Sequence, residues 1–437
     1  MLNSFKISKG HNLLIKGVPD RKVIEIESPP FLIFHPSLIN GIKTKVLVKE
    51  GDDVKVGSAL YYDKRNPEAF FVSTCSGKVT KIIYGDRRVV TAIHVSNDNQ
   101  YKSENLDFNI SRDSLLKSGL WTHIRQRPFS KVPMPDCAPK SIFISGLSTQ
   151  PFALDLEFLF SNSDNYFQHG VNVLKEIFNC DINLTSSKSS FLKELKNVNH
   201  YTFNNLHPAG NVGIQIHHID SIKNGKDLRL YLTVQDLNRI GEFYTKKRYP
   251  VYKYISIGGN GFNNPSFFKH IIGTPIADII QKDYSSLSRI ISGDVLSGHE
   301  TTIESSLGYY DEILSIIKTS NKRDFLGWLY PGFNKYSLTN TFLSKIFKKP
   351  FGKLDTKLNG SVRSIIPMGN WDKVLPMNIL PEFLIKNILV EDIEMMEKLG
   401  IYECDAEDFS LCAFACQSKI EVSEIIKSGL ELIEKEG

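Results

Sequence analysis

Two neighbouring segments decide the fold of this chain: KVLVKEGDDVKVGSALYYD at residues 45–63 and FFVSTCSGKVTKIIYGDRRVVTAIHV at residues 70–95. Short runs rich in β-branched and aromatic residues alternate there with tight turns at residues 50–53 and 76–77. Residues 78–82 and 88–93 show the alternation of a half-buried strand. The sequence therefore predicts a β-sandwich over residues 1–105.

This pattern is typical of a lipoyl- or biotinyl-like barrel-sandwich hybrid. Such domains elsewhere carry a swinging prosthetic arm on a lysine at a hairpin tip. The corresponding tip here is residues 63–67, which contains Lys64 but lacks the residues that usually flank an attachment lysine. We therefore expect a carrier-like scaffold that is not used as a carrier, which indicates one component of a larger redox assembly. A biotin- or lipoyl-type carrier protein stays open as an alternative.

Length and composition are those of a soluble protein with several domains. The chain has 437 residues, of which 41% are hydrophobic and 23% are charged. Its net charge of +5 is spread along the chain rather than clustered, so nucleic acid is not expected as a partner. No apolar run approaches the ~18–20 residues that span a bilayer, and the first residues are unlike a signal peptide. We expect a cytoplasmic protein that can reach a membrane through integral partner subunits.

The strand and helix periods predict a multidomain α+β chain with five parts. They are the sandwich at 1–105, a helix and proline-rich connector at 106–139, a Rossmann-like α/β domain at 140–250, a small β-grasp-like domain at 251–330 and a C-terminal helical domain at 331–437. In the α/β domain, strands are expected at 140–146, 182–185, 213–216 and 228–233, with helices at 165–178 and 234–245.

The C-terminal part shows the start and stop signals of several helices. Ser337 is expected to cap a helix that Pro350 ends, and Pro381 is expected to open a second helix that ends at Gly400. Apolar residues at helical spacing predict a last helix over residues 421–435.

The common cofactor and metal signatures are missing from the sequence. There is neither a GxSxG elbow nor a GxxxxGK[ST] phosphate loop, and Ile303 replaces the second histidine of an HExxH pattern that begins at His299. The glycine-rich turn at 258–261 departs from the GxGxxG fingerprint. Cys412 and Cys416 share one helix face, where two small buried side chains are the favoured interpretation. We therefore expect no cofactor and no metal bound by this chain.

The segment RQRPFSKVP at residues 125–133 gathers aromatic and basic side chains in an extended, proline-rich loop. A quinone site needs an apolar slot and one or two hydrogen-bond donors, and Phe129, Arg127 and Lys131 could supply them. The same loop, which also carries Arg125, could instead dock another subunit. Both interpretations place function on these four residues.

His207 is the fifth candidate residue. It precedes a proline and two nearby glycines in HPAGNVG at residues 207–213. Its imidazole could donate to a carbonyl oxygen of a quinone or flavin, or it could fix the loop through its own ring. His217 and His218 are expected on opposite faces of a strand, where they cannot hold one metal together.

Several longer segments, taken together, resemble one protein family. They are ISKG at 7–10, SGLWTHIRQRPFSKVP at 118–133, HPAGNVG at 207–213, LGWLYPGFNKYSLTNTFL at 326–343, GSVRSIIPMGNWDKVLPMNILP at 360–381, CAFAC at 412–416 and IEKEG at 433–437. Over essentially its whole length, the chain resembles the A-subunit family of the sodium-translocating NADH:quinone oxidoreductase (Nqr complex).

That resemblance implies a peripheral subunit on the cytoplasmic face of the bacterial inner membrane. The implied complex passes electrons from NADH to ubiquinone and exports Na⁺. Its other subunits, integral membrane ones included, are the implied partners, and they would hold the flavins and the iron–sulfur centre. Ubiquinone is the implied ligand, although no catalytic residue is carried over. A free-standing nucleotide-binding oxidoreductase is the remaining alternative, against which the missing glycine fingerprint argues.

Overall fold

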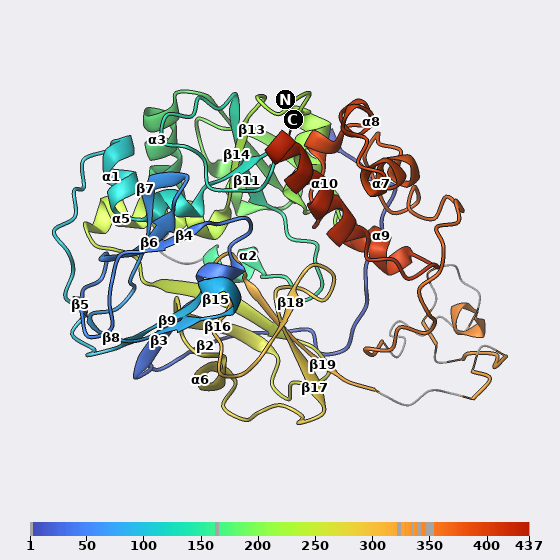
Figure 1. Ribbon diagram of the computed structural model, residues 1–437, viewed down its shortest axis with the longest axis horizontal. Helices are drawn as coiled ribbons and strands as arrows, with labels where there is room; N and C mark the ends of the chain where they lie inside the picture. The colour runs from blue at the N-terminus through green and yellow to red at the C-terminus, as the bar shows by residue number, and fades with distance from the viewer. Residues whose placement is uncertain are drawn as a thin grey trace.

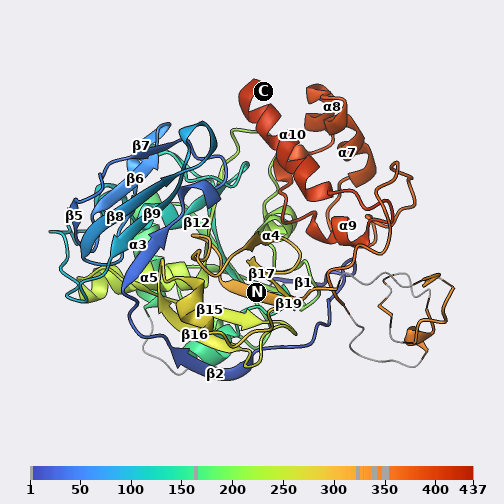
Figure 2. The same cartoon turned by 60° about the horizontal axis from the view of Figure 1, so that its bottom comes forward.

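The computed structural model describes residues 3–161, 166–320, 325–327, 329–333, 335–336, 338, 342–346 and 354–436. Its strands form a β-sandwich and two six-stranded sheets, and helices of the C-terminal region pack beside them (Figure 1). Seen from a second direction, the sandwich and the C-terminal helices flank the two larger sheets (Figure 2).

The sandwich is built from two antiparallel sheets. One has the order β3 (Phe31–Phe34), β9 (Val90–Ser96), β8 (Gly77–Tyr84), β5 (Asp53–Val54), and the other has the order β4 (Thr44–Val46), β6 (Ala59–Asp63), β7 (Asn66–Val72). Buried Leu32, Leu60 and Ile93 belong to its core. Asp63 pairs with Asn66, so the β6–β7 hairpin turns through residues 64–65. The predicted β-sandwich is confirmed, and its hairpin tip lies where the sequence placed it.

Two strands that precede the sandwich belong to other sheets. The first, β1 (Asn3–Phe5), pairs in parallel with β13 (Asn199–Phe203), and β2 (Asp20–Glu25) pairs with β16 (Ser266–Ile271). The short 3-10 turns η1 (Pro36–Leu38) and η2 (Asp86–Arg88) lie within the sandwich region. The N-terminal residues thus tie the sandwich to both larger sheets.

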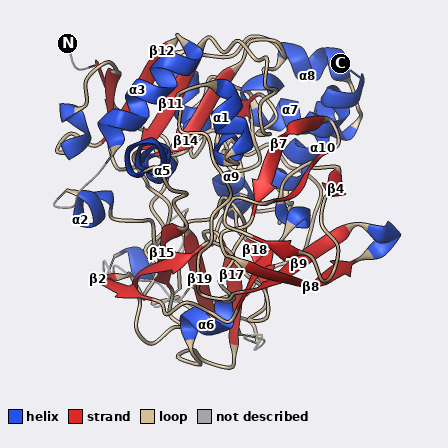
Figure 3. Ribbon diagram, turned by 90° about the vertical axis from the view of Figure 1, so that its left-hand side faces the viewer, coloured by secondary structure: helices blue, strands red, loops and turns tan. Residues whose placement is uncertain are grey.

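The α/β sheet has the order β1-β13-β12-β11-β14-β10. Its parallel strands β11 (Ser141–Gly146), β12 (Asp181–Ser186) and β14 (Arg229–Thr233) are joined at one edge by the antiparallel β10 (Arg125–Arg127). Ile142 and Ile144 pack with α3 (Phe167–Phe178) and α5 (Val234–Lys246), whereas Phe143 packs with α4 (Val212–Ile219) and the C-terminal helices. Both faces of the sheet are therefore buried (Figure 3).

Smaller elements connect these strands. They are α1 (Arg112–Lys117), η3 (Leu120–His123), α2 (Leu156–Phe160) and η4 (Phe191–Glu194). The Ser111 hydroxyl caps α1 by accepting a hydrogen bond from the amide of Ser114 at 3.1 Å. The helix predicted at the start of the connector is therefore present.

One predicted strand is wrong. Residues 213–216 lie in the helix α4, and β1, β10 and β13 of the same sheet were not predicted as strands. A short apolar run fits either structure, and here Val212, Ile214 and Ile216 are buried as part of a helix. His217 and His218 consequently lie on α4, where His217 pairs with Glu403 and His218 contacts the carbonyl of Ile214.

The second six-stranded sheet has the order β18-β17-β19-β15-β16-β2. It contains β15 (Tyr252–Gly258), β17 (Ser288–Ser292), β18 (His299–Thr301) and β19 (Ile313–Lys318), and α6 (Ile276–Ile280) packs on its core. The glycine-rich turn after β15 allows close packing, because a Cβ on Gly259 would lie 2.2 Å from the carbonyl oxygen of Ile316. This turn therefore has a structural role.

The C-terminal region contains α7 (Pro381–Leu389), α8 (Ile393–Lys398), η6 (Ile401–Glu403), α9 (Ser410–Ala415) and α10 (Val422–Glu436). The helix predicted from Pro381 to Gly400 is interrupted, because Glu391 adopts a positive φ of 57° between α7 and α8. Ser337 and Pro350 lie outside the described residues, and η5 (Leu343–Lys345) is a short 3-10 turn between them. Among the residues that the structure describes, no helix has both the length and the apolar character needed to cross a bilayer.

Candidate functional site

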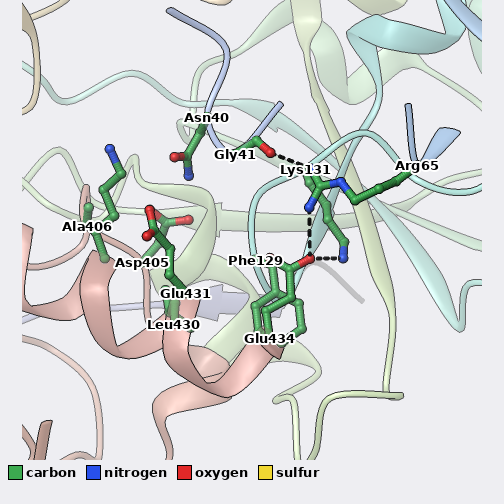
Figure 4. Close-up of a pocket in the computed structure, with 11 residues that line it drawn as sticks. Asn40, Gly41, Arg65, Phe129, Lys131, Asp405, Ala406, Leu430, Glu431 and Glu434 are labelled. Atoms are coloured by element: carbon green, nitrogen blue, oxygen red, sulfur yellow. Dashed lines mark hydrogen bonds and ion pairs between the residues drawn. The ribbon is translucent and has the colours of Figure 1, made fainter. Parts of the chain in front are cut away.

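A groove opens where the sandwich, the loop after β10 and the helix α10 meet (Figure 4). It consists of two adjoining hollows of about 40 and 70 Å³, which share Asn40, Arg65, Lys131 and Glu434 as lining residues. Each hollow is small and open to solvent, so a ligand is expected to lie along the groove rather than inside a closed pocket. The groove therefore joins residues from the start, the middle and the end of the chain.

The two hollows differ in chemistry. One has mostly polar and charged lining residues and is also lined by Gly41, Phe129, Asp405, Ala406, Lys427, Leu430 and Glu431. The other has a mainly apolar surface and is also lined by Ile39, Ile42, Asp63, Asn66, Ala69, Phe71, Val132 and Met134. A molecule with a polar head and an apolar tail matches this pair of surfaces.

An ion-pair cluster separates the hollows. The Lys131 ammonium and the Arg65 guanidinium both face Glu434 of α10, with Arg65 Nη1 4.0 Å from Glu434 Oε1 (Figure 4). Arg65 also donates to Asp63 Oδ2 at 2.7 Å within the hairpin tip and to the carbonyl of Gly41 outside it. The Lys131, Glu434 and Arg65 side chains are 34%, 28% and 40% exposed, so solvent weakens these pairs.

Phe129 enters the groove from an unusual backbone conformation. Phe129 and Ser130 have φ values of 78° and 46°, a region that non-glycine residues rarely occupy. The amide of Gln126 donates to the carbonyl of Lys131 at 2.9 Å and closes the loop, while the Ser130 hydroxyl donates to Asp405. The surrounding contacts thus hold the Phe129 ring 5.2 Å from the Lys131 ammonium.

Arg127 lies behind the groove rather than in it. Its side chain is 1% exposed, and its guanidinium contacts Glu407 at 2.7 Å, Asp408 at 3.1 Å and Asp405 at 3.3 Å. Burial would lower the pKa of Arg127, but the surrounding carboxylates raise it well above its ordinary value. Burial raises the pKa of Asp408 to about 8, against the opposing effect of Arg127. The predicted loop thus anchors the C-terminal region of its own chain.

Arg125 and His207 also lie outside the groove lining. Arg125 stands beside Tyr231 and Tyr310, whose ring centroids are 4.6 and 4.4 Å from its Cζ. His207 is 2% exposed, its Nδ1 lies 3.2 Å from the Thr149 hydroxyl, and burial lowers its pKa to about 4. Of the five predicted site residues, Phe129 and Lys131 line the groove together, and Arg125, Arg127 and His207 do not.

His207 joins two segments that the sequence analysis singled out separately. Its amide donates to Asn12 Oδ1 at 2.7 Å, and its carbonyl accepts from the amide of His11 at 2.8 Å. A Cβ on Gly10 would lie 2.2 Å from that carbonyl oxygen, so glycine is required there. The ISKG and HPAGNVG segments therefore meet at a packed seam.

Arg65 and Glu434 were missed as site residues. Arg65 lies at the hairpin tip that the sequence identified, but Glu434 is one of several acidic residues on the outer face of α10. Their contact joins opposite ends of the chain, and no local spacing reports it. The acidic partners of Arg127 at positions 405, 407 and 408 were also missed, because they are distant from it in sequence.

An acidic side chain of the chain itself lies at the crevice of the α/β sheet. The strand order β13-β12-β11-β14 reverses between β11 and β14, and ligands of such sheets bind beyond the strand ends at this point. Here the carboxyl group of Glu312 lies at the start of α5, where it accepts from Thr233 Oγ1 at 2.9 Å and from Gln235 Nε2 at 3.0 Å. An acidic side chain thus occupies a position that suits a phosphate.

The six cysteines are free thiols, and five of them are buried. Burial raises the pKa of Cys75 to about 12 and raises the pKa of Cys404 well above its ordinary value. In the described part of the chain, no group of three or more histidine, cysteine or acidic side chains is arranged to hold a metal ion.

Three family models match consecutive parts of the chain. They are described as the NqrA N-terminal barrel-sandwich hybrid domain at residues 5–98, the NqrA second alpha/beta domain at residues 107–249 and the NQRA C-terminal domain at residues 254–302. The first two descriptions agree with the sandwich and the α/β sheet described above.

Curated relatives match over nearly the full length. Proteins described as the A-subunit of Na(+)-translocating NADH-quinone reductase are 34% identical in Yersinia pseudotuberculosis, 32% in Neisseria meningitidis and 34% in Haemophilus influenzae. Each match covers 99% of this chain, and 100%, 100% and 99% of the respective relative. The structure of an air-oxidized NAD+-reducing [NiFe]-hydrogenase matches with a TM-score of 0.38 at 8% identity, over 69% of this chain and 55% of that one.

Proposed function

The chain belongs to the A-subunit family of Na(+)-translocating NADH-quinone reductase, and on this premise we propose that it supports electron transfer from NADH to ubiquinone coupled to Na⁺ export. It acts as a peripheral subunit on the cytoplasmic face of the bacterial inner membrane. Other subunits of the reductase, including integral membrane ones, hold it there and carry the flavins and the iron–sulfur centre. This chain binds no cofactor of its own.

The two-part groove is the observation that supports a role of this chain in quinone binding. A ubiquinone molecule has a ring with carbonyl oxygens and an apolar tail. The apolar hollow offers Ile39, Phe71 and Met134 to the tail, while Phe129 and the donors Lys131 and Arg65 stand where the ring would lie. This is the combination of apolar wall and few polar groups that small-molecule sites require.

The ion pairs in the groove are weak enough to exchange. Exposed pairs such as Lys131–Glu434 stabilise a fold by only ~0–1 kcal/mol. A quinone carbonyl can replace the Glu434 carboxylate as the acceptor for Lys131, since the lysine has three donors on a flexible stem. Binding then costs little conformational stability.

Both alternatives fit the structure less well. Glu312 at the start of α5 would repel a nucleotide phosphate in the sheet crevice, which counts against a nucleotide-binding oxidoreductase. For a carrier protein, Lys64 would need a mobile hairpin tip, whereas Arg65 ties this tip to the carbonyl of Gly41. The Rossmann-like, β-grasp-like and C-terminal helical assignments are part of the present proposal, and the strand orders of the two larger sheets support the first two.

Photoaffinity labelling of the intact membrane complex tests the quinone site. With a photoreactive ubiquinone analogue, the labelled peptides should include residues 129–134 or the end of α10, and unlabelled ubiquinone should compete. The Phe129→Ala variant should lose most of this label, while Leu389→Ala on the exposed side of α7 should keep it. Competed label confined to other subunits would refute the proposed site.

A further inference from the structure

Two arginines stand next to each other on one face of β10 and differ in their surroundings. Arg125 and Arg127 are two residues apart, so their side chains share a face of the strand. Arg125 pairs with Tyr231 of β14 in the strand register, and the Tyr231 ring lies 4.6 Å from Arg125 Cζ and 5.7 Å from Arg127 Cζ. The two guanidinium groups therefore have one aromatic neighbour in common.

The side chains of the two arginines differ in their polar partners. Arg127 is surrounded by three carboxyl groups at 2.7–3.3 Å. The Arg125 side chain, by contrast, forms neither a hydrogen bond nor an ion pair within the described ranges, and its Nε, like that of Arg127, is buried without a partner. The residue as a whole is nevertheless partly exposed, and its two outer nitrogens are not among the fully buried unpaired atoms of the described residues. Buried donors are rarely left unpaired in native structures, and each exception calls for a reason.

Aromatic contacts hold the Arg125 side chain in place but do not accept hydrogen bonds from its N–H groups. The Tyr310 ring lies 4.4 Å from its Cζ, and the Tyr310 hydroxyl donates to the carbonyl of Thr122 at 2.9 Å. The Tyr231 hydroxyl donates to Ser130 Oγ at 3.1 Å. Both rings are thus fixed by their own hydrogen bonds. Cation–π contacts attract the guanidinium but provide no oxygen acceptor for its N–H groups.

The nearest acidic group is already engaged. Glu407 attracts the Arg125 guanidinium electrostatically without forming an ion pair with it. Its carboxylate instead contacts Arg127 Nη2 at 2.7 Å. Asp405 accepts from Ser130 and faces Arg127. The residues around Arg125 therefore supply a fixed position and partial charge balance, and they leave the N–H edge of the guanidinium without an oxygen.

We propose that Arg125 is a binding site for an oxyanion, either a carboxylate or a phosphate group. A guanidinium offers parallel N–H donors that match two oxygens of such a group. Because the arginine is already positioned by Tyr231 and Tyr310, binding requires little ordering of the side chain. This site lies outside the groove lining and does not depend on quinone binding.

Anion titration of the full chain tests the site. Thermal unfolding is followed while sodium phosphate, acetate or formate replaces sodium chloride at constant ionic strength. The wild-type chain should show a saturable rise in Tm with at least one of these anions. Arg125→Gln should abolish this rise, and Arg125→Lys should weaken binding roughly tenfold, because it keeps the charge but loses the paired donors.

Arg21→Gln is the matched control, since Arg21 already has an acceptor in Asp155 at 2.9 Å and is 73% exposed. This variant should keep the anion response of the wild-type chain. An equal Tm rise in Arg125→Gln and wild type would show an unspecific salt effect and would overturn the site.

A carboxylate can also come from a partner protein of the complex rather than from solution. In that case free anions leave Tm unchanged, and Arg125→Gln lowers the yield of assembled complex while Arg21→Gln does not. No saturable anion response together with normal assembly of Arg125→Gln rules out both sources. Failure of the quinone experiment would leave this outcome unaffected, because the chain alone is titrated here.

Discussion

The Asp408 carboxyl group lies against Gly213 in the first turn of α4, where an added Cβ would come within 2.1 Å of Asp408 Oδ2. On its other side, the same oxygen is 3.1 Å from Arg127 Nη1. Asn211 adds a hydrogen bond from its side chain to the carbonyl of Glu407 at 3.0 Å. Three segments that are distant in sequence, the loop after β10, the start of α4 and the residues before α9, therefore form one buried junction.

Gly213→Ala should destabilise this junction. The new methyl group overlaps a carboxyl group that is 1% exposed and held by Arg127, so the C-terminal region must shift. We expect a loss of about 1–3 kcal/mol in the free energy of unfolding, measured by urea titration. Gly360→Ala is the control, because the nearest atom to its added Cβ is the end of the Lys419 side chain at 3.5 Å. Equal stability of the two variants would contradict the close contact.

Arg127→Ala should lower the free energy of unfolding by more than Gly213→Ala does. It leaves Asp405, Glu407 and the fully buried Asp408 without their shared cation, and breaking a buried pair in this way typically costs roughly 3–5 kcal/mol. Limited proteolysis should cleave the variant before α9 at protease levels that leave the wild-type chain intact. Arg21→Ala removes an exposed pair and should change stability by less than ~1 kcal/mol. A wild-type proteolysis pattern for Arg127→Ala would argue against an anchoring role.

Local patterns in the sequence predict much of the fold. Alternation and turn signals between residues 45 and 95 predict the sandwich, and helical spacing predicts α3 and α5. The strand expected at 213–216 failed because Val212, Ile214 and Ile216 are buried on a helix whose length is close to that of a strand. Such a run is too short for its hydrophobic period to distinguish a helix from a strand.

The candidate site is less predictable than the fold. The residue types at 129 and 131 point to a ligand or a partner, and both residues do line the groove. Nothing local shows that Arg127 is buried while Phe129 is partly exposed, since that depends on acidic residues more than 270 positions away. The contact of Arg65 with Glu434 likewise follows from the packing of α10 on the sandwich.

His207 should make stability depend on pH in the acidic range. Burial lowers its pKa to about 4 in the folded chain, whereas the unfolded chain binds this proton at about 6.5. The unfolded state is therefore favoured increasingly as the pH falls from 6.5 to 4, with a loss of about 3 kcal/mol over this range. The contribution is fully present above pH 6.5. Urea unfolding at several pH values measures the slope.

Comparison of variants isolates the histidine from other titrating groups. His207→Gln should flatten the slope between pH 4 and 6.5 relative to the wild-type chain. Thr149→Val removes the hydroxyl next to Nδ1 but keeps the imidazole, so its slope should stay close to that of the wild type. Identical slopes in all three proteins would mean that His207 titrates alike in the folded and unfolded chain.

Glu434→Gln should separate ligand binding from stability in the groove. The exposed pairs of Glu434 with Lys131 and Arg65 contribute less than ~1 kcal/mol, so the free energy of unfolding should barely change. Lys131 then no longer has to leave a carboxylate in order to donate to a quinone carbonyl. We therefore expect a lower KM for a short-chain ubiquinone in the assembled reductase, with kcat unchanged. Glu431→Gln alters the same hollow without touching these pairs, so its KM should match the wild type, and a fall in KM for both variants would point to the overall charge of the groove instead.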